Sequence, residues 1–325
     1  MNGSIINISK RITHIKSTFT WKTMCGRIIL ISIISVIISF LLSTVIYTEF
    51  IKNLLVEKIG QELLVNLNNK TVIMDNYLNN ISDSARKFSL TEELYTLFLN
   101  MPKNPNEAYY YNSDKIITQF LLQHFTNQSD IYAAYLVTDN FIYGHMQLYQ
   151  TISMLKKSEL YQKVGNSNGE CVWISTFHYK DMFIKSPVSP VNDMRLFALA
   201  KKVRFISIND IKTEPGENEL PILLLYFKDD FFNKFFASGD KSFSDAWILD
   251  GQTVIFHSNG KKIPFNLDEL KNISGNSGRF ITKDKKMLVA FSRSNATGWN
   301  AITVKSISDI DERNFRVRDN NNGHS

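Results

Sequence analysis

Residues 247–256 read WILDGQTVIF. Two short apolar runs flank an Asp-Gly pair at 250–251, and this pattern is a strong signal for a β-hairpin. Residues 132–143 read YAAYLVTDNFIY and repeat the pattern, with an Asp-Asn pair at 139–140 as the turn. We therefore expect two lobes of related design, each built on an antiparallel sheet. A chance likeness between two ordinary hairpins is the alternative.

Further strand patterns follow each hairpin, and a long helix pattern precedes both. The expected strands are Leu196–Phe205 and Ile222–Phe227 after the first hairpin, and Met287–Ser292 and Trp299–Val304 after the second. Between residues 51 and 88, apolar positions recur every three or four residues among polar ones, which predicts an amphipathic helix. This run holds only two heptads and contains Gly60, so we expect it to pack along the lobes rather than form a free coiled coil.

The region before this helix indicates a membrane anchor. Residues 28–47 carry no charge, and 20 helical residues span about 30 Å, the thickness of the hydrocarbon core. Five basic residues and no acidic one precede this segment, and Glu49 follows it, so the N-terminus is expected in the cytoplasm and the bulk outside. A buried soluble helix and a cleaved signal peptide are the alternatives. The segment is longer than a usual signal-peptide core, and no A-x-A cleavage site follows it.

Charge and motif content argue against several functions. The net charge is +6, but removing the five basic residues of 1–27 leaves 32 basic against 31 acidic residues, so no nucleic-acid partner is expected. The sequence contains no G-x-G, P-loop, G-x-S-x-G or zinc-type histidine pattern. We therefore predict no catalytic residue, no metal site and no cofactor. An exported, membrane-tethered enzyme whose catalytic residues meet only in the fold stays an alternative.

The order of several short motifs resembles the double Cache sensory regions of bacterial receptors. The resemblance is closest to YesM-like sensor histidine kinases and to related membrane-bound regulators with AraC-type DNA-binding outputs. It covers about residues 25–310 and is carried by Leu160-Tyr161-Gln162-Lys163, Gly169-Glu170-Cys171-Val172-Trp173-Ile174, Trp247-Ile248-Leu249-Asp250-Gly251 and Ser294-Asn295-Ala296-Thr297-Gly298-Trp299. It implies an α+β fold in which an N-terminal transmembrane helix continues into a long helix, followed by two PAS-like antiparallel-sheet lobes. The implied function is extracellular small-molecule sensing, as the input part of a two-component signal transduction receptor.

The resemblance also implies a division of the chain. The expected parts are a basic cytoplasmic stub (1–27), a transmembrane signal anchor (28–48), a helical stalk (49–100), a membrane-distal Cache lobe (101–215), a membrane-proximal Cache lobe (216–308) and a polar tail (309–325). A complete receptor of this kind would continue into a second membrane helix and a kinase. We therefore expect either a truncated gene product or a sensor that works through a separate output partner.

In Cache receptors the ligand lies between the sheet and the loops above it, usually in the membrane-distal lobe. The residues expected there are Tyr135, Tyr143, His145, Trp173, His178, Tyr179, Asp181, Arg195 and Lys201. Aromatic walls with a few charged groups suit a polar organic ligand. Residues 171–176 lack the Arg and aromatic signature of amino-acid-binding Cache domains, so we expect a carbohydrate. Core packing and simple surface exposure are the alternative roles for these residues.

Two further partners are expected. The first is the lipid bilayer around residues 28–48. The second is another copy of the chain in a homodimer, with contacts of the long helix near the membrane. A structural envelope protein that dimerises through this helix and binds no small molecule is the remaining alternative.

Overall fold

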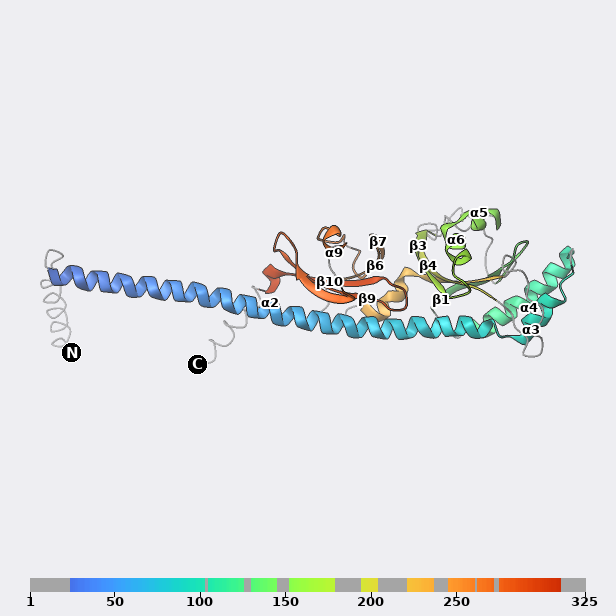
Figure 1. Cartoon of the computed structure of the whole chain (residues 1–325), viewed down its shortest axis with the longest axis horizontal. Coiled ribbons are helices and arrows are strands. Elements are labelled where there is room, and N and C mark those ends of the chain that lie inside the picture. The colour runs from blue at the N-terminus through green and yellow to red at the C-terminus, as the bar shows by residue number, and fades with distance from the viewer. Residues whose placement is uncertain are drawn as a thin grey trace, which may run out of the picture. The chain divides into compact units, whose positions relative to one another are not determined.

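The computed structural model describes residues 24–102, 105–125, 130–144, 152–178, 194–203, 221–236, 245–260, 262–271 and 275–310. It shows a 65-residue helix, α2 (Met24–Phe88), followed by two five-stranded antiparallel sheets (Figure 1). The chain forms two compact units, residues 1–58 and residues 59–325. The predicted positions His145, Tyr179 and Asp181 lie outside the described residues.

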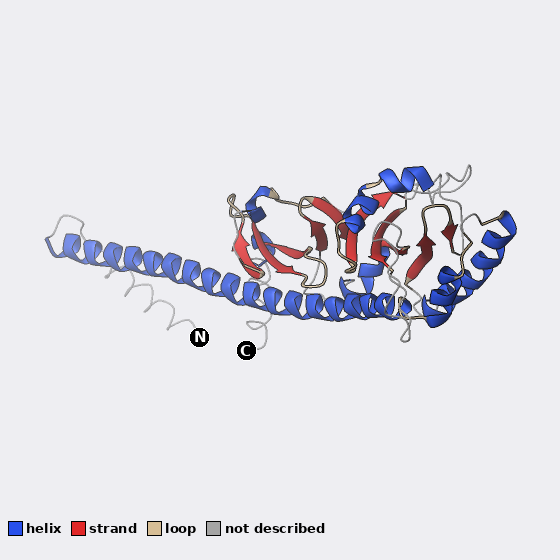
Figure 2. Ribbon diagram, turned by 45° about the vertical axis from the view of Figure 1, so that its right-hand side comes forward, coloured by secondary structure: helices blue, strands red, loops and turns tan. Residues whose placement is uncertain are grey.

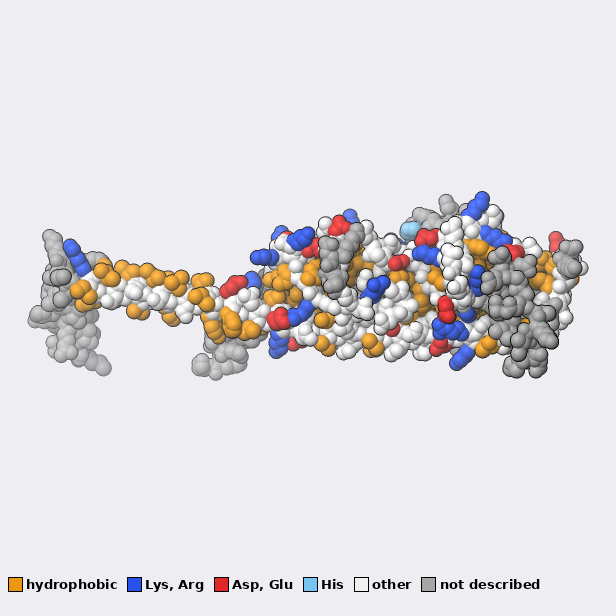
Figure 3. Space-filling view, in the orientation of Figure 1, with side chains coloured by type: hydrophobic (Ala, Val, Ile, Leu, Met, Phe, Trp, Pro, Cys, Tyr) orange, Lys and Arg blue, Asp and Glu red, His pale blue; other side chains and the backbone are white. Residues whose placement is uncertain are grey.

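In the first unit, the described residues 24–58 belong to the N-terminal part of α2. Its aliphatic side chains are exposed between Arg27 and Glu49, and Figure 3 shows hydrophobic side chains along this part of the helix, without charged side chains between them. The Ser32 and Thr44 hydroxyls donate to the carbonyls four residues earlier, at 3.0 and 2.8 Å. Among the described helices, Gly26–Phe88 is long and apolar enough to cross a membrane. The most apolar stretch of this helix has no residue buried among the described parts of the protein.

Each sheet of the second unit begins with one of the two predicted hairpins. The first sheet contains β1 (Ile131–Val137), β2 (Ile142–Tyr143), β3 (Val172–His178), β4 (Arg195–Lys202) and β5 (Ile222–Lys228), in the order β2-β1-β5-β4-β3. The second contains β6 (Ala246–Asp250), β7 (Thr253–His257), β8 (Ser277–Ile281), β9 (Met287–Arg293) and β10 (Asn300–Ser306), in the order β7-β6-β10-β9-β8. Numbered within each lobe, both orders are 2-1-5-4-3. The predicted α+β fold with two sheet lobes is therefore confirmed.

The structure moves one expected boundary. Strand β5 pairs with β1 and β4 in the first sheet, with Leu136 opposite Leu223 and Ala200 opposite Leu224. The expected division between residues 215 and 216 would separate this central strand from its own lobe. A division after Phe236, beyond the short elements that follow β5, keeps each sheet whole.

Helix α2 runs along one face of both sheets, and short helices lie over the opposite faces and beside α2 (Figures 1 and 2). The helices beside the first sheet are α3 (Glu92–Leu99), α4 (Glu107–Phe125), α5 (Ile152–Lys157) and α6 (Glu159–Gly165). The 3-10 helix η3 (Asp229–Phe232) and α8 (Asn233–Phe236) follow β5, and α9 (Asp268–Lys271) covers the second sheet. Each sheet therefore has two buried faces.

The predicted apolar stripe of α2 is buried from Leu63 onward. Its members there are at most 3% exposed: Leu63, Leu67, Met74, Leu78, Ile81, Ala85 and Phe88. Gly60 allows a close approach to the second sheet, because a Cβ atom there would lie 2.9 Å from Arg279 Nη1 and 3.4 Å from Leu288 Cδ1. The glycine that interrupts the pattern thus has a packing role.

Aromatic rings join the two lobes. Trp299, which precedes β10, lies 5.9 Å from Phe197 of β4 and 6.3 Å from Phe232 of η3, measured between ring centroids. Phe232 in turn lies 5.5 Å from Phe256 of β7. Because Phe197, Phe232 and Trp299 are at most 2% exposed, the lobes share one apolar core at this point.

A buried carboxylate fixes α2 to the second lobe. Asp75, only 6% exposed, accepts a hydrogen bond from Ser294 Oγ at 2.5 Å and one from the Asn295 backbone N–H at 2.8 Å. Ser294 Oγ also accepts from the Thr297 backbone N–H at 3.1 Å. The Thr-Gly-Trp turn that opens the last strand is thereby tied to the helix.

Replacing Asp75 with alanine should lower the free energy of unfolding by about 3 kcal/mol, because two buried donors lose a charged acceptor. Asp75→Asn keeps one acceptor oxygen and should cost less. Denaturant unfolding of the full chain in detergent measures both values. The matched control is Asp83→Ala on the same helix, since Asp83 is 57% exposed and pairs only with Arg86 at the surface. Equal losses for Asp75→Ala and Asp83→Ala would show that the buried carboxylate has no special role.

Candidate functional site

The face of the first sheet under α5 and α6 carries a group of aromatic side chains, which we call the aromatic wall. Its members are Tyr132, Tyr135, Tyr161, Phe177 and Tyr226. The Tyr226 ring lies 5.9 Å from the Tyr135 ring and 5.6 Å from the Phe177 ring, both in edge-to-face arrangements. Tyr135 and Tyr226 are buried, whereas the other three are partly buried. The wall thus has a packed base and an accessible rim.

Helices α5 and α6 are held over this face by packing and by a cap. Leu155 of α5 and Leu160 and Val164 of α6 are buried in the same apolar cluster. Ser158 caps α6, with its hydroxyl accepting from the Tyr161 backbone N–H at 3.3 Å. The cap fixes the start of the helix that carries Tyr161, one of the rim residues.

Only one described member of the predicted ligand set, Tyr135, lies in the aromatic wall. The other five described members lie on β2, β3 and β4 and point to the opposite face: Tyr143, Trp173, His178, Arg195 and Lys201. Strand alternation explains this, because neighbouring residues of a strand face opposite sides. The structure therefore divides the predicted set between two faces of one sheet.

Trp173 and Arg195 lie at the junction of the lobes. The Trp173 ring is 5.6 Å from Phe227 and 6.4 Å from Trp299 of the second lobe. Arg195 Nη1 donates to the Val254 carbonyl of β7 at 3.2 Å. These contacts give both residues a packing and joining role.

His178 and Lys201 also lie away from the wall. His178 is paired in register with Arg195 across β3 and β4. The Lys201 ammonium donates to the Gly169 carbonyl, in the turn before β3. Lys201 therefore holds a turn in place.

Tyr143 is fully buried beneath α3 and α4. Its ring lies 4.8 Å from Phe141 and 6.4 Å from Phe98. Burial, with smaller effects from Tyr110, Tyr109 and Asp114, raises the pKa of Tyr143 above its ordinary value. The phenol is therefore a neutral part of the core near the distal end of the lobe.

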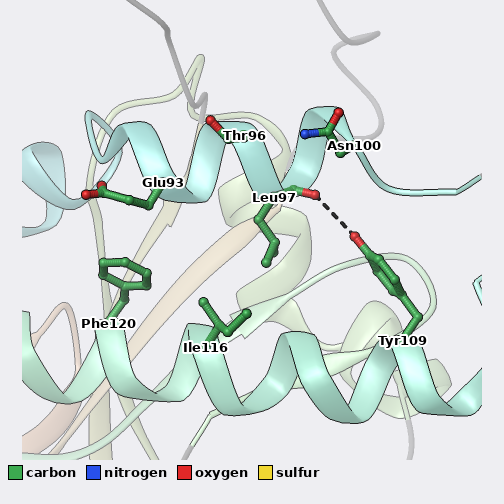
Figure 4. Close-up of a pocket in the computed structure, with 7 residues that line it drawn as sticks. All are labelled: Glu93, Thr96, Leu97, Asn100, Tyr109, Ile116 and Phe120. Carbon is green, nitrogen blue, oxygen red and sulfur yellow. Dashed lines mark hydrogen bonds between the residues drawn. The ribbon is translucent and has the colours of Figure 1, made fainter.

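A hollow of about 590 Å³ lies between α3 and α4 (Figure 4). It is lined by Glu93, Thr96, Leu97, Asn100, Tyr109, Ile116 and Phe120. The Tyr109 hydroxyl donates to the Leu97 carbonyl at 3.2 Å and bridges the two helices. Few polar groups converge on this hollow, so it is a weaker candidate for a polar ligand than the aromatic wall.

Of the aromatic wall, the residues predicted from the sequence include Tyr135 alone. Tyr226 lies within the run ILLLYFK, which reads as a continuous buried strand, and Tyr161 was used only as part of a motif. The alternation of side chains along a strand is the signal that places Tyr226 on this face. Tyr226 follows Ile222 and Leu224 at every second position, and all three lie in the cluster that contains Tyr135.

No family model and no curated protein match the sequence. Solved structures with a similar fold include the extracellular domain of vpHK1S-Z8, which is named as a histidine kinase, at 13% identity and a TM-score of 0.54. That match covers 79% of this chain and 98% of the other. The ligand-binding domain of the Campylobacter jejuni chemoreceptor Tlp3, in complex with 4-methylisoleucine, matches at 12% identity and a TM-score of 0.50. That match covers 79% of this chain and 94% of the other. The ligand-binding domain of Mlp24 with asparagine matches at 13% identity and a TM-score of 0.50, covering 79% of this chain and 97% of the other.

These similarities define the class of fold. Chemoreceptor and histidine kinase extracellular ligand-binding domains, which are Cache-like, share the long helix and the two antiparallel sheets of this chain. The Tlp3 and Mlp24 structures are ligand-binding domains, and the vpHK1S-Z8 structure is an extracellular domain.

Asp229, which directly follows β5, carries a carboxylate whose charged form is disfavoured by burial. Burial and the neighbouring Asp230 raise the pKa of Asp229 above its ordinary value of 3.8, while Arg195 acts in the opposite direction. Because the folded-state pKa lies above the unfolded value of 3.8, the wild type loses stability as the pH rises from below 3.8 to above the folded-state pKa. Asp229→Asn should therefore be more stable than the wild type at pH 7, and the difference should vanish toward pH 3.

Parallel unfolding curves of the two proteins at pH 3 and pH 7 measure this difference. Asp83→Asn, at an exposed position of α2, is the control for a general effect of charge removal. A stability difference for Asp229→Asn that does not change with pH would contradict the assignment.

Proposed function

We propose that the protein is a membrane-anchored receptor domain that senses a small molecule outside the cell. The observation that carries the proposal is the similar fold, which covers 79% of this chain and nearly all of the chemoreceptor and kinase domains compared. At 12–13% identity the likeness concerns the fold, so the sensing role is an inference from it.

The aromatic wall is the proposed ligand-binding face. Aromatic rings and phenol hydroxyls together suit a polar organic molecule with an apolar face, which is typical of a sugar ring. Lys228 adds a positive charge at the rim, with Nζ 5.2 Å from the centroid of the Tyr132 ring. We propose carbohydrates as the first ligand class. Amino acids are the second class, because the compared Tlp3 and Mlp24 domains hold 4-methylisoleucine and asparagine.

The membrane anchor is proposed for the uncharged segment of α2. Residues 28–47 expose only apolar and hydroxyl side chains, and the hydroxyls of Ser32 and Thr44 bond to the helix backbone. Polar groups in lipid need such partners within the segment. The basic residues before it favour a cytoplasmic N-terminus, with the bulk of the chain outside a bacterial cell.

The proposed output of the receptor is a YesM-like kinase, or a separate protein with the same role. Helix α2 is the element through which a change in the lobes would reach the membrane, because it packs on both sheets and continues into the apolar segment. Ligand binding would select one packing of the first lobe on this helix.

A screen of sugars and amino acids by thermal unfolding tests the sensing role. A true ligand at 100 times its Kd should stabilise the protein by about 2.7 kcal/mol and raise Tm by several degrees. Tyr161→Ala and Tyr132→Ala, at the rim of the wall, should each weaken that ligand about tenfold or more.

The control for this screen is Tyr111→Ala, since Tyr111 is 74% exposed on α4 and distant from the wall in the chain. A ligand whose affinity falls equally in all three variants would place the site elsewhere. A folded protein that no compound in either class stabilises would contradict the proposed ligand classes.

Protease treatment of whole cells tests the proposed topology. Protease added outside should degrade the lobes and leave an N-terminal epitope tag protected until the cells are permeabilised. Loss of the tag from intact cells, with the lobes uncut, would reverse the orientation.

A further inference from the structure

Three aromatic rings surround the ammonium of Lys234. Nζ lies 3.4 Å from the centroid of the Tyr77 ring, 4.0 Å from that of Phe231 and 5.1 Å from that of Phe235. The rings also contact one another, with centroids 5.5 to 5.9 Å apart. Asp130 completes the surroundings, accepting a hydrogen bond from Nζ at 2.6 Å. Aromatic faces with a carboxylate are the chemistry by which proteins bind organic ammonium groups.

This cage joins elements that are far apart in the sequence. Tyr77 belongs to α2, Asp130 directly precedes β1, and Lys234 belongs to α8 in the segment that leaves the first lobe. The Tyr77 hydroxyl donates to the same Asp130 carboxylate that binds Lys234. One ammonium thus holds α8 to α2.

The charges of the cage depend on one another. Burial alone would raise the pKa of Asp130, but the hydrogen bonds from Lys234 and Tyr77 outweigh it and lower the pKa below 3.8. Burial, together with Asp130, raises the pKa of Tyr77 to about 12. The carboxylate is therefore ionised and the phenol neutral at physiological pH, and the cage keeps a net negative charge that an ammonium must balance.

Solutes can reach the cage. A hollow of about 610 Å³ is lined by Asp130, Ile131, Tyr132, Lys228, Asp230, Phe231, Asn233 and Lys234. The side chains of Lys234 and Asp130 are 30% and 24% exposed, so part of the ion pair faces this hollow. An ammonium compound in solution has an open approach to the carboxylate that Lys234 occupies.

We propose that Tyr77, Phe231, Phe235 and Asp130 form a binding site for organic ammonium groups, which Lys234 fills as a tethered ligand. A soluble ammonium compound that replaces Lys234 releases α8 from α2. This site lies at the foot of β1 and β5 and does not depend on a ligand at the aromatic wall.

The first test is chemical rescue of Lys234→Ala in the full chain in detergent. The substitution removes three carbons and the ammonium, which together are n-propylammonium. It should lower Tm by about 5 °C, and n-propylammonium chloride should restore most of this loss in a saturable manner, relative to equal concentrations of sodium chloride. Tm of the wild type should rise less.

Two control variants isolate the cage. Lys156→Ala breaks the Lys156–Asp139 ion pair, which has the same 2.6 Å distance but 35% and 46% exposed side chains. It should show no rescue. Adding Asp130→Asn to Lys234→Ala should abolish the rescue. Equal responses in all variants, or none in Lys234→Ala, would overturn the site.

The second test uses the wild type, so it holds even where Lys234→Ala fails to fold. Tetramethylammonium, which has no N–H to acylate, is added before brief treatment with an amine-acylating reagent, and modified lysines are mapped by mass spectrometry. Acylation of Lys234 should rise severalfold with tetramethylammonium, while that of Lys156 stays constant. Unchanged acylation of Lys234 would overturn its release by soluble ammonium compounds.

Discussion

Burial of one stripe of α2 is the constraint on which the second unit depends. Both sheets share α2, which runs along one face of each, while α5 and α6 cover the opposite face of the first sheet. Fully burying a large apolar side chain contributes about 2 kcal/mol, and the stripe from Leu63 to Phe88 supplies seven buried residues. Each sheet uses the part of α2 from Ile59 onward to bury one of its faces, so this part of the helix belongs to the same compact unit as the lobes.

Polar contacts then fix where each lobe meets the helix. Asp75 binds the turn of the second lobe through Ser294, and two residues later Tyr77 binds Asp130 at the entry to the first sheet. Such contacts specify position more than they add stability, because a buried polar group has few alternative partners. A small change in either lobe is therefore felt within one turn of the same helix.

Local patterns in the sequence were sufficient for the architecture, because hairpin turns and apolar periodicity are set by neighbouring residues. They were insufficient for the site, because the face to which a strand residue points depends on its register. Trp173 and Tyr135 are both aromatic strand residues, yet they lie on opposite faces of the first sheet. A register shift between Ile174 and Phe177 alters the alternation along β3, and no sequence motif announces it. The cage around Lys234 could not be predicted from the sequence either, because residues 77, 130 and 234 come together only in the fold.

Strand β5 provides a continuous path between the aromatic wall and the cage. Tyr226 belongs to the wall, whereas its neighbour Phe227 faces the opposite side, 5.7 Å from Phe231 of the cage. The chain then passes through η3 directly into α8 and Lys234. Because the interior is close-packed, a ligand that repacks the ring of Tyr226 must displace the strand or its neighbours, and Phe231 is among the first groups affected. The two proposed sites are therefore joined by consecutive residues that begin in the strand at the centre of the first sheet.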